Sequence, residues 1–422
     1  MAAGLGLAFA GRGAAMTALI WVLYASSGSA WLVSGAMLAT FGVSTATSPF
    51  TGHAGDRHDR RRVVVVSAIF TALALAVCAP LALAGLTIPI VIAIVVASAT
   101  HGAISPAIQG AVPALVEDEQ RSAANSLVNA AKSGGFMLGP GLGGALLAVI
   151  GPAGVFLGSA LMLAAAGILV GRLDGEFRAA PHEDGPGGHM DGFRRLMSDG
   201  WLRLLTVAWA LVMVGVGPVI VAEVVLARHF AVGSLGYGLI AVFWDGGGVI
   251  GALAGRRISR RLEQPAVVGG CVAIAFGFAV VGLTPIFWPV LVGMFISGSF
   301  DAFGVVAAQN IIQRRTPDHL RSRVSAALDA VVLGTMALSF ALGAPLVELL
   351  GPQGVYLAAG AVAALGALLL LPMLVGMPDL PPRVRATRRR IERPVRTIAR
   401  NVSYGRRRVV ERVRRRAPRT RA

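Results

Sequence analysis

The chain has 422 residues, of which 55% are hydrophobic and 14% are charged, and its mean hydropathy is +0.71. Soluble chains of this length normally carry about 25% charged residues, so the composition excludes an ordinary water-soluble protein and indicates that lipid surrounds much of the surface. The formal net charge is +17, but the segment from Arg383 to Arg421 holds 17 arginines against two glutamates. The basic character therefore describes a tail, and we expect no nucleic-acid partner.

Charge-poor apolar runs recur along the chain at lengths that suit a bilayer. A membrane-spanning helix needs about 20 mostly apolar residues. Such runs lie at about 4–25, 30–51, 63–85, 88–112, 123–148, 153–171, 201–224, 235–255, 264–284, 286–310, 324–347 and 354–375. They predict an all-α integral membrane protein with twelve transmembrane helices, whose first span itself can direct insertion.

Arginine clusters alternate with uncharged links between these spans. The clusters follow the second, eighth and tenth spans: Arg57, Arg60, Arg61 and Arg62; Arg256, Arg257, Arg260 and Arg261; Arg314, Arg315, Arg321 and Arg323. Positively charged loops favour the cytoplasmic side. We therefore expect both termini in the cytoplasm and the protein in the cell (inner) membrane.

An internal repeat divides the chain into two halves. A shift of about 200 residues aligns Gly151–Leu157 with Gly351–Leu357 and Asp118 with Asp318. Because the shift crosses an even number of spans, the halves have the same topology. We predict a first half at 1–171, a cytoplasmic linker rich in Gly and Pro at 172–200, a second half at 201–377 and a basic tail at 378–422, with the halves meeting at a midplane site.

A short polar motif follows the second span and contains Gly52, Asp56, Arg57, Arg60 and Arg61. It resembles the signature between helices 2 and 3 of the major facilitator superfamily, although Asp59 stands where many members have glycine. The resemblance implies the superfamily fold and a conformational gate. In this gate Asp56 holds the outward-facing state by contacting the eleventh span, at 324–347, near Arg323. The alternative is that these arginines only set topology.

Two further stretches, at 115–144 and 309–323, resemble the drug-exporter branch that includes macrolide efflux proteins and the enterobactin exporter. The most specific part lies in the fifth span, at Gly135, Gly139, Pro140, Gly143 and Gly144. It is similar to a glycine-proline pattern that this superfamily associates with antiporters. Small residues allow close helix approach and proline kinks a helix, so we expect a tight, bendable contact between the halves.

Ionisable residues inside spans cost about 2.5–3.5 kcal/mol each on insertion scales, so each demands a reason. The candidates are Arg12, His101, Lys132, Asp245, Asp301 and Asp329, with Glu223 near the outer end of the seventh span. The resemblance implies that the first, fourth, seventh and tenth spans line the cavity. These four spans carry, in that order, Arg12, His101, Glu223 and Asp301.

His101 and Asp301 are partners under the 200-residue shift. We predict Asp301 as the leading proton-coupling site, with His101 or Arg12 as its partner and Asp245 as the second candidate. The structural alternatives are an ion pair between Asp301 and Arg12, and a His101 side chain that caps a backbone carbonyl near Pro106.

Lys132 and Asn129 share a helical face in the fifth span, and Asn129 pairs with Asp329 under the shift. Lys132 and Asp329 are predicted either to neutralise each other between the halves or to contact an anionic substrate. A charge pair without a transport role is the simpler alternative.

Other sites are not indicated. Cys78 and Cys271 fall inside spans and make no metal or redox motif, and we expect no cofactor, no metal and no enzymatic activity.

The arginines of the tail alternate with aliphatic residues, which favours an amphipathic helix on anionic lipids. The resemblance implies a monomer.

We therefore predict a proton-coupled antiporter that exports a small amphipathic compound, such as a drug, secondary metabolite or siderophore. An importer of a small solute, and a non-transporting sensor or scaffold that keeps the fold, remain as alternatives.

Overall fold

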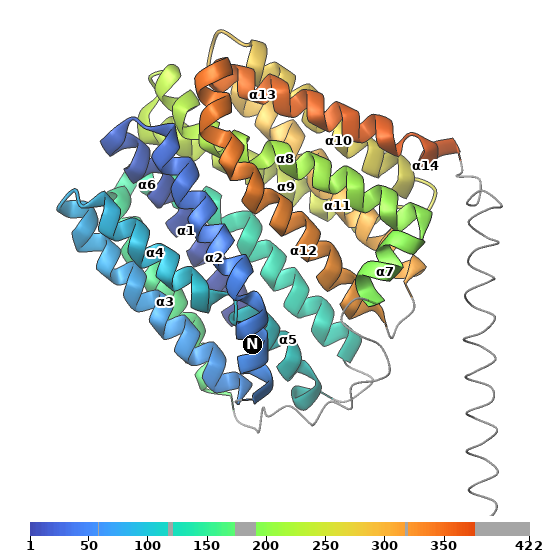
Figure 1. Ribbon diagram of the computed structural model, residues 1–422, viewed down its shortest axis with the longest axis horizontal. Coiled ribbons are helices and arrows are strands. Elements are labelled where there is room, and N and C mark those ends of the chain that lie inside the picture. Colours follow the sequence, from blue (N-terminus) through green and yellow to red (C-terminus); the bar gives the residue numbers. More distant parts are fainter. Residues whose placement is uncertain (58, 117–120, 174–190, 317–319, 376–422) are drawn as a thin grey trace, which may run out of the picture. The chain divides into compact units, whose positions relative to one another are not determined.

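A computed structural model describes residues 1–57, 59–116, 121–173, 191–316 and 320–375 (Figure 1). The predicted basic tail and most of the predicted linker lie outside the described residues. The described part is helical: α1 Ala2–Ser27, α2 Ala30–Arg57, α3 Arg60–Leu83, α4 Thr87–His101, α5 Ile104–Leu115, α6 Arg121–Gly171, α7 Asp191–Ser198, α8 Gly200–His229, α9 Gly233–Gly255, α10 Glu263–Leu283, α11 Trp288–Arg315, α12 Arg321–Ser339, the 3-10 turn η3 Phe340–Leu342, α13 Gly343–Leu370 and α14 Pro372–Val375.

The described helices match the predicted spans in length and hydropathy. Nine helices or helical runs among them are long and apolar enough to cross a membrane. The runs 130–171 and 323–374 each cover parts of two predicted spans, and the predicted span 88–112 is divided between α4 and α5. Every predicted span therefore falls on described helix, and the fold is that of an all-α integral membrane protein.

The repeated sequence has the same backbone at both copies. Gly151, inside α6, has φ 66° and ψ 178°, and Gly351, inside α13, has φ 70° and ψ 169°. Only glycine occupies this region of backbone space comfortably. Each glycine, followed by a proline, reverses the chain between two predicted spans without a loop.

Replacement of Gly151 by alanine is expected to destabilise the protein, because an L side chain at this φ and ψ costs about 1–3 kcal/mol. Gly351→Ala should behave in the same way. Gly158→Ala, a site with open space and ordinary helical backbone, provides the control. Thermal unfolding in detergent measures the difference, and equal melting temperatures for all three variants would contradict the strain.

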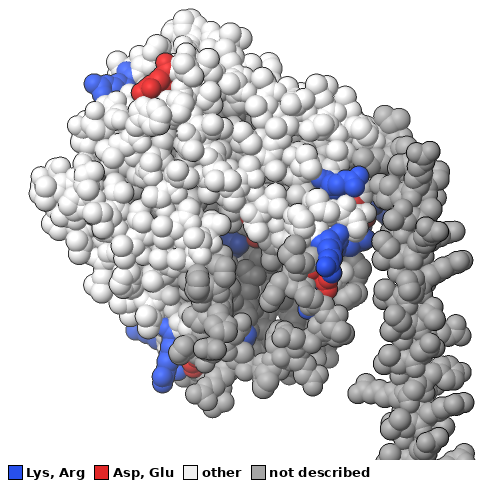
Figure 2. Space-filling view, in the orientation of Figure 1, with Lys and Arg blue, Asp and Glu red and all other residues white. Residues whose placement is uncertain are grey.

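The surface suits a bilayer. Figure 2 shows a broad uncharged surface that separates charged groups at the upper left from those at the right and lower left. Large apolar side chains are exposed on the helices, such as Leu73 at 63% and Phe276 at 58%. In water, contiguous apolar surface of this kind would drive association, whereas lipid accommodates it.

Within each half, helices pack through long contacts. In the N-terminal half (α1–α6), α1 and α3 both pack on α6; in the C-terminal half (α8–α14), α11 packs on α9 and α10, and α8 packs on α13. Residues 1–374 form one compact unit. The division into halves with the predicted boundaries remains a prediction.

The short helix α7 was not predicted, because its segment appears as a polar linker. Leu196 of α7 is fully buried beside Leu202 of α8 and Val324 of α12. An eight-residue helix is marginal alone, so its formation depends on these tertiary contacts. Gly192 meets the backbone of Arg323 so closely that any Cβ would clash, which fixes α7 against α12.

The two halves contact each other at the end where α1 ends, Gly28 turns the chain and α2 begins; we call it the Gly28 end. There Ser34 accepts a hydrogen bond from the backbone N–H of Ala344 at 2.8 Å, and the rings of Phe41 and Phe340 stack with centroids 5.3 Å apart. The predicted arginine clusters follow α2, α9 and α11 at the opposite helix ends. If those clusters face the cytoplasm as predicted, the Gly28 end is the outer end.

Candidate functional site

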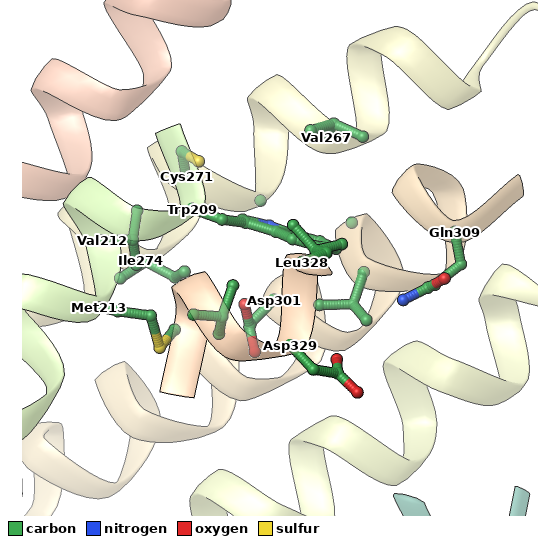
Figure 3. Close-up of a pocket in the computed structure, with 14 residues that line it drawn as sticks. Trp209, Val212, Met213, Val267, Cys271, Ile274, Asp301, Gln309, Leu328 and Asp329 are labelled. Atoms are coloured by element: carbon green, nitrogen blue, oxygen red, sulfur yellow. The ribbon is translucent and has the colours of Figure 1, made fainter. Parts of the chain in front are cut away.

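A cavity of about 200 Å³ lies in the C-terminal half between α8, α10, α11 and α12. It is lined by Trp209, Val212, Met213, Val267, Gly270, Cys271, Ile274, Asp301, Gly304, Val305, Gln309, Leu328, Asp329 and Val332. In Figure 3 the Trp209 ring lies across this pocket, and the carboxylates of Asp301 and Asp329 lie on one side of it. The wall is thus mostly apolar, with two acids and one amide placed within it.

Asp301 comes from the middle of α11 and is half-buried. No hydrogen bond or ion pair joins its carboxylate to another described residue. The ion pair with Arg12 that the sequence left open is absent from the described residues; the guanidinium of Arg12 instead lies over the ring of Phe41, 5.9 Å from its centroid. Asp301 is therefore available to a proton or to another cation.

Lys132 of α6 and Asp329 of α12 approach each other across the two halves. The Lys132 Nζ and an Asp329 carboxylate oxygen are 3.9 Å apart, and the Asp329 side chain is 59% exposed. The same Lys132 ammonium lies over the Phe9 ring, 5.9 Å from its centroid. At this distance the ion pair is loose, so either partner could exchange it for a ligand. Asn129 lies in α6, but its side chain is outside the description.

His101 ends α4, where a tightened turn separates this helix from α5. The side chain is only 4% exposed, and neither ring nitrogen has a hydrogen-bond partner among the described residues. The alternative that His101 caps a backbone carbonyl is therefore wrong among the described residues. The edge contact with Phe9, at a centroid distance of 5.5 Å, fixes the ring by packing. No contact in the described residues brings His101 to Asp301.

Asp245 bridges the two halves by a hydrogen bond. Its Oδ2 accepts from the backbone N–H of Gly141 at 2.7 Å, and the residue is 7% exposed. Gly141 follows Pro140, which kinks α6 and has no N–H of its own, and α9 carries Asp245. The other acid, Glu223 of α8, is half-buried with no bond to another described residue.

The candidate charges are separated by half. Arg12, Lys132 and His101 lie in the N-terminal half, and Glu223, Asp245, Asp301 and Asp329 lie in the C-terminal half. The sequence placed each of them in a span. It missed Trp209 and Gln309 as pocket residues, because neither carries a charge that a membrane position makes conspicuous.

The glycine-proline motif of α6 divides between two neighbours. Gly135, Gly139 and Gly143 face α1 of their own half, where a Cβ on Gly143 would lie 2.5 Å from the Cα of Ala14. Gly144 faces α9 of the other half, where a Cβ would lie 2.5 Å from the Cα of Gly238. The expected contact between halves thus involves Gly144 and Gly141, while the other three glycines hold α1 against α6.

The predicted gate motif is only partly described. The surroundings of Gly52 and the side chains of Asp56 and Arg57 lie outside the description. Arg61 donates a hydrogen bond from Nη1 to the carbonyl oxygen of Leu173 at 2.8 Å. The Arg60 side chain is also engaged and is not free.

Two further groups bear on the gate. Asp59, the departure from the family pattern, caps α3 by accepting from the backbone N–H groups of Arg61 and Arg62. Arg323, near which Asp56 was expected to contact the neighbouring helix, has its Nη1 3.7 Å from Oδ2 of Asp191 in α7. No group of three or more potential metal ligands occurs among the residues that the structure describes.

Comparison with known proteins agrees with this architecture. A family model described as Major Facilitator Superfamily matches residues 1–331 and 284–418. The chain is 28% identical over 375 residues to the multidrug efflux pump Tap of Mycolicibacterium fortuitum, covering 83% of this chain and 88% of that protein.

Two solved structures show the same fold at low identity. The inward open xylose transporter XylE from E. coli superposes with a TM-score of 0.63 at 15% identity, covering 87% of this chain and 94% of that one. The human organic anion transporter MFSD10 superposes with a TM-score of 0.63 at 18% identity, covering 87% and 98%. Transporters of different substrates thus share the fold, so the substrate must be argued from the site.

Proposed function

Because this chain belongs to the Major Facilitator Superfamily and is therefore a multi-pass membrane transporter, we propose that it exports a small amphipathic compound in exchange for protons. The observation that carries the proposal is the Asp301 carboxylate, which lines a largely apolar cavity without a partner among the described residues. A lone carboxylate at membrane depth is costly. A proton, or a cation that competes with it, offsets that cost.

Export is supported by two further observations. The glycine-proline motif of α6 resembles the antiporter pattern, and its Gly144 packs directly on α9 of the other half. The relative Tap is a multidrug efflux pump. An amphipathic substrate suits walls formed by residues such as Val212 and Ile274.

In the mechanism we propose, the halves rock around the cavity. Contacts at the Gly28 end close one side, and these must break when the other side closes. Protonation of Asp301 and binding of substrate are mutually exclusive at one pocket, so the return of the empty carrier requires the proton. With the arginine clusters and both termini in the cytoplasm of the cell (inner) membrane, this exchange moves the substrate outward.

The test is growth of an efflux-deficient bacterium that expresses the full chain, against a panel of toxic amphipathic compounds. We expect resistance to a subset of the panel, and we expect Asp301→Asn to return growth to that of the empty vector. Asp199→Asn serves as the control at equal membrane abundance, because Asp199 is not among the pocket residues and an asparagine can still accept the two backbone hydrogen bonds that cap α8.

Other outcomes are informative. Resistance that survives Asp301→Asn keeps export and moves the proton site, with Asp245 as the next candidate. Increased sensitivity to a compound indicates import instead. No change with any compound, in cells where the protein is inserted, contradicts broad export and favours a narrow substrate or a non-transporting role.

A further inference from the structure

The pocket between α8, α10, α11 and α12 has a charge that its own residues do not balance. Two carboxylates line it, those of Asp301 and Asp329, and no Lys, Arg or His is among its lining residues. The nearest cation to Asp329 is Lys132, at 3.9 Å from the other half, and Asp301 has no described partner. The pocket therefore favours a positively charged occupant.

The rest of the wall is suited to an organic cation and poorly suited to a metal ion. Calcium takes six to eight oxygen ligands and magnesium a near-ideal octahedron, whereas the side-chain oxygens here come from two carboxylates and the amide of Gln309. The indole of Trp209 lies across the pocket (Figure 3). Indole faces attract quaternary ammonium groups through their quadrupole.

The dimensions indicate a subsite. The cavity has a volume of about 200 Å³, while sites that enclose a whole drug-sized ligand are about 300–1,000 Å³. Asp329, with its side chain 59% exposed, lies at the rim that faces Lys132 of the N-terminal half. A molecule could thus place a charged end in the pocket and leave its apolar body in the space between the halves.

We propose that this pocket is the recognition subsite for the cationic end of the substrate, so that the substrate class is amphipathic organic cations with an ammonium group. Asp301 binds the ammonium directly, the Trp209 ring covers it, and Asp329 adds a second negative charge when Lys132 is displaced. The inference rests on the proposed transport function, because it names the class of molecule that the same cavity takes.

The test measures binding of a phenylalkyl trimethylammonium ion to the full-length protein in detergent by isothermal titration calorimetry. Its permanent charge removes any titration of the probe. The matched ligand is the neutral analogue in which carbon replaces nitrogen, and a phenylalkyl sulfonate is the anionic counterpart. We expect the cation to bind at least about tenfold more tightly than the neutral analogue, the factor that about one favourable charge contact provides.

Variants assign the contact to residues. Asp301→Asn is expected to weaken cation binding about tenfold or more, and Asp301→Glu, which keeps the charge, should retain most of it. Trp209→Leu should weaken the cation about 5- to 30-fold, as expected for loss of a desolvated cation–π contact, with little effect on the neutral analogue. Asp199→Asn, which removes an acid outside the pocket, should bind like the unmodified protein.

Two results would overturn the inference: equal affinity for the cation and its neutral analogue, or cation binding that Asp301→Asn leaves unchanged in a folded protein. Either can occur while the growth test still shows export, in which case only the substrate class is wrong. Conversely, cation binding that depends on Asp301 without any resistance phenotype would retain the subsite and reject export.

Discussion

Replacement of Gly144 by valine is expected to open the Gly28 end of the transporter. A Cβ at Gly144 would lie 2.5 Å from the Cα of Gly238 and 2.9 Å from its carbonyl oxygen, both backbone atoms that cannot rotate away. Overpacking of a close contact costs about 1–3 kcal/mol. Because α6 and α9 belong to different halves, the halves can relieve the clash by separating at that end, which shifts the population by about 5- to 150-fold.

Neighbouring glycines of α6 provide matched controls. Gly143→Val makes a clash of similar size with Ala14, but α1 lies in the same half. We expect this variant to lower the melting temperature without opening the Gly28 end. Gly134, which has nothing within 4 Å of a built Cβ, should tolerate valine without either effect.

The measurement is electron–electron double resonance between spin labels on Leu86 and Ile286, two exposed positions in turns of different halves at this end. Cys78 and Cys271, which are free and buried, are first replaced by alanine. A distance distribution that moves to longer values for Gly144→Val alone supports the expectation. Identical distributions for Gly143→Val and Gly144→Val would mean that the motif does not control separation of the halves.

The helices were predictable because lipid restricts the solutions open to the chain. Backbone polar groups must be satisfied within the segment, so apolar runs of suitable length, such as 63–85, could only be helices. The repeat predicted the matching turns at Gly151 and Gly351, and both have the same unusual backbone. The helix α7 was not predicted, because its stability comes from burial of Leu196 against residues that are distant in the sequence.

The charges of the site were predictable, whereas their partners were not. Each acid stood out because membrane burial makes it costly, and the repeat related Asp329 to the α6 face that carries Lys132. The bond from the Gly141 N–H to Asp245 and the lack of a partner for Asp301 depend on how helices rotate and pack. No local pattern encodes that rotation, and Trp209 gave no signal for the same reason.

The glycine motif shows how helix periodicity refines a sequence pattern. Gly135, Gly139 and Gly143 are four residues apart and share one helical face, whereas Gly144 is turned about 100° from Gly143 in a helix of 3.6 residues per turn. One face therefore meets α1 and the other meets α9. The prediction that the whole motif forms the contact between the halves is therefore wrong for Gly135, Gly139 and Gly143, because they pack on α1 of their own half.

Asp245 is expected to hold the two halves together, and its replacement by alanine should weaken closure of the Gly28 end about 10- to 150-fold. The Asp245 carboxylate accepts a 2.7 Å hydrogen bond from the Gly141 N–H across the two halves. Hydrogen bonds to charged groups contribute about 1.5–3 kcal/mol, and the Gly141 N–H loses this acceptor when the carboxylate is removed. The spin-label distances between Leu86 and Ile286 report the change in population.

Asp245→Asn separates this contact between the halves from a role in proton transfer. An asparagine oxygen can still accept from Gly141, so the spin-label distances should stay near those of the unmodified protein and resistance should largely persist. Closure that is intact together with lost transport would instead assign the coupling proton to Asp245 rather than Asp301. Because Asp301 lines the cavity without a described partner and Asp245 already has one, the structure favours Asp301 as the exchangeable site and Asp245 as the group that holds α9 on the kink of α6.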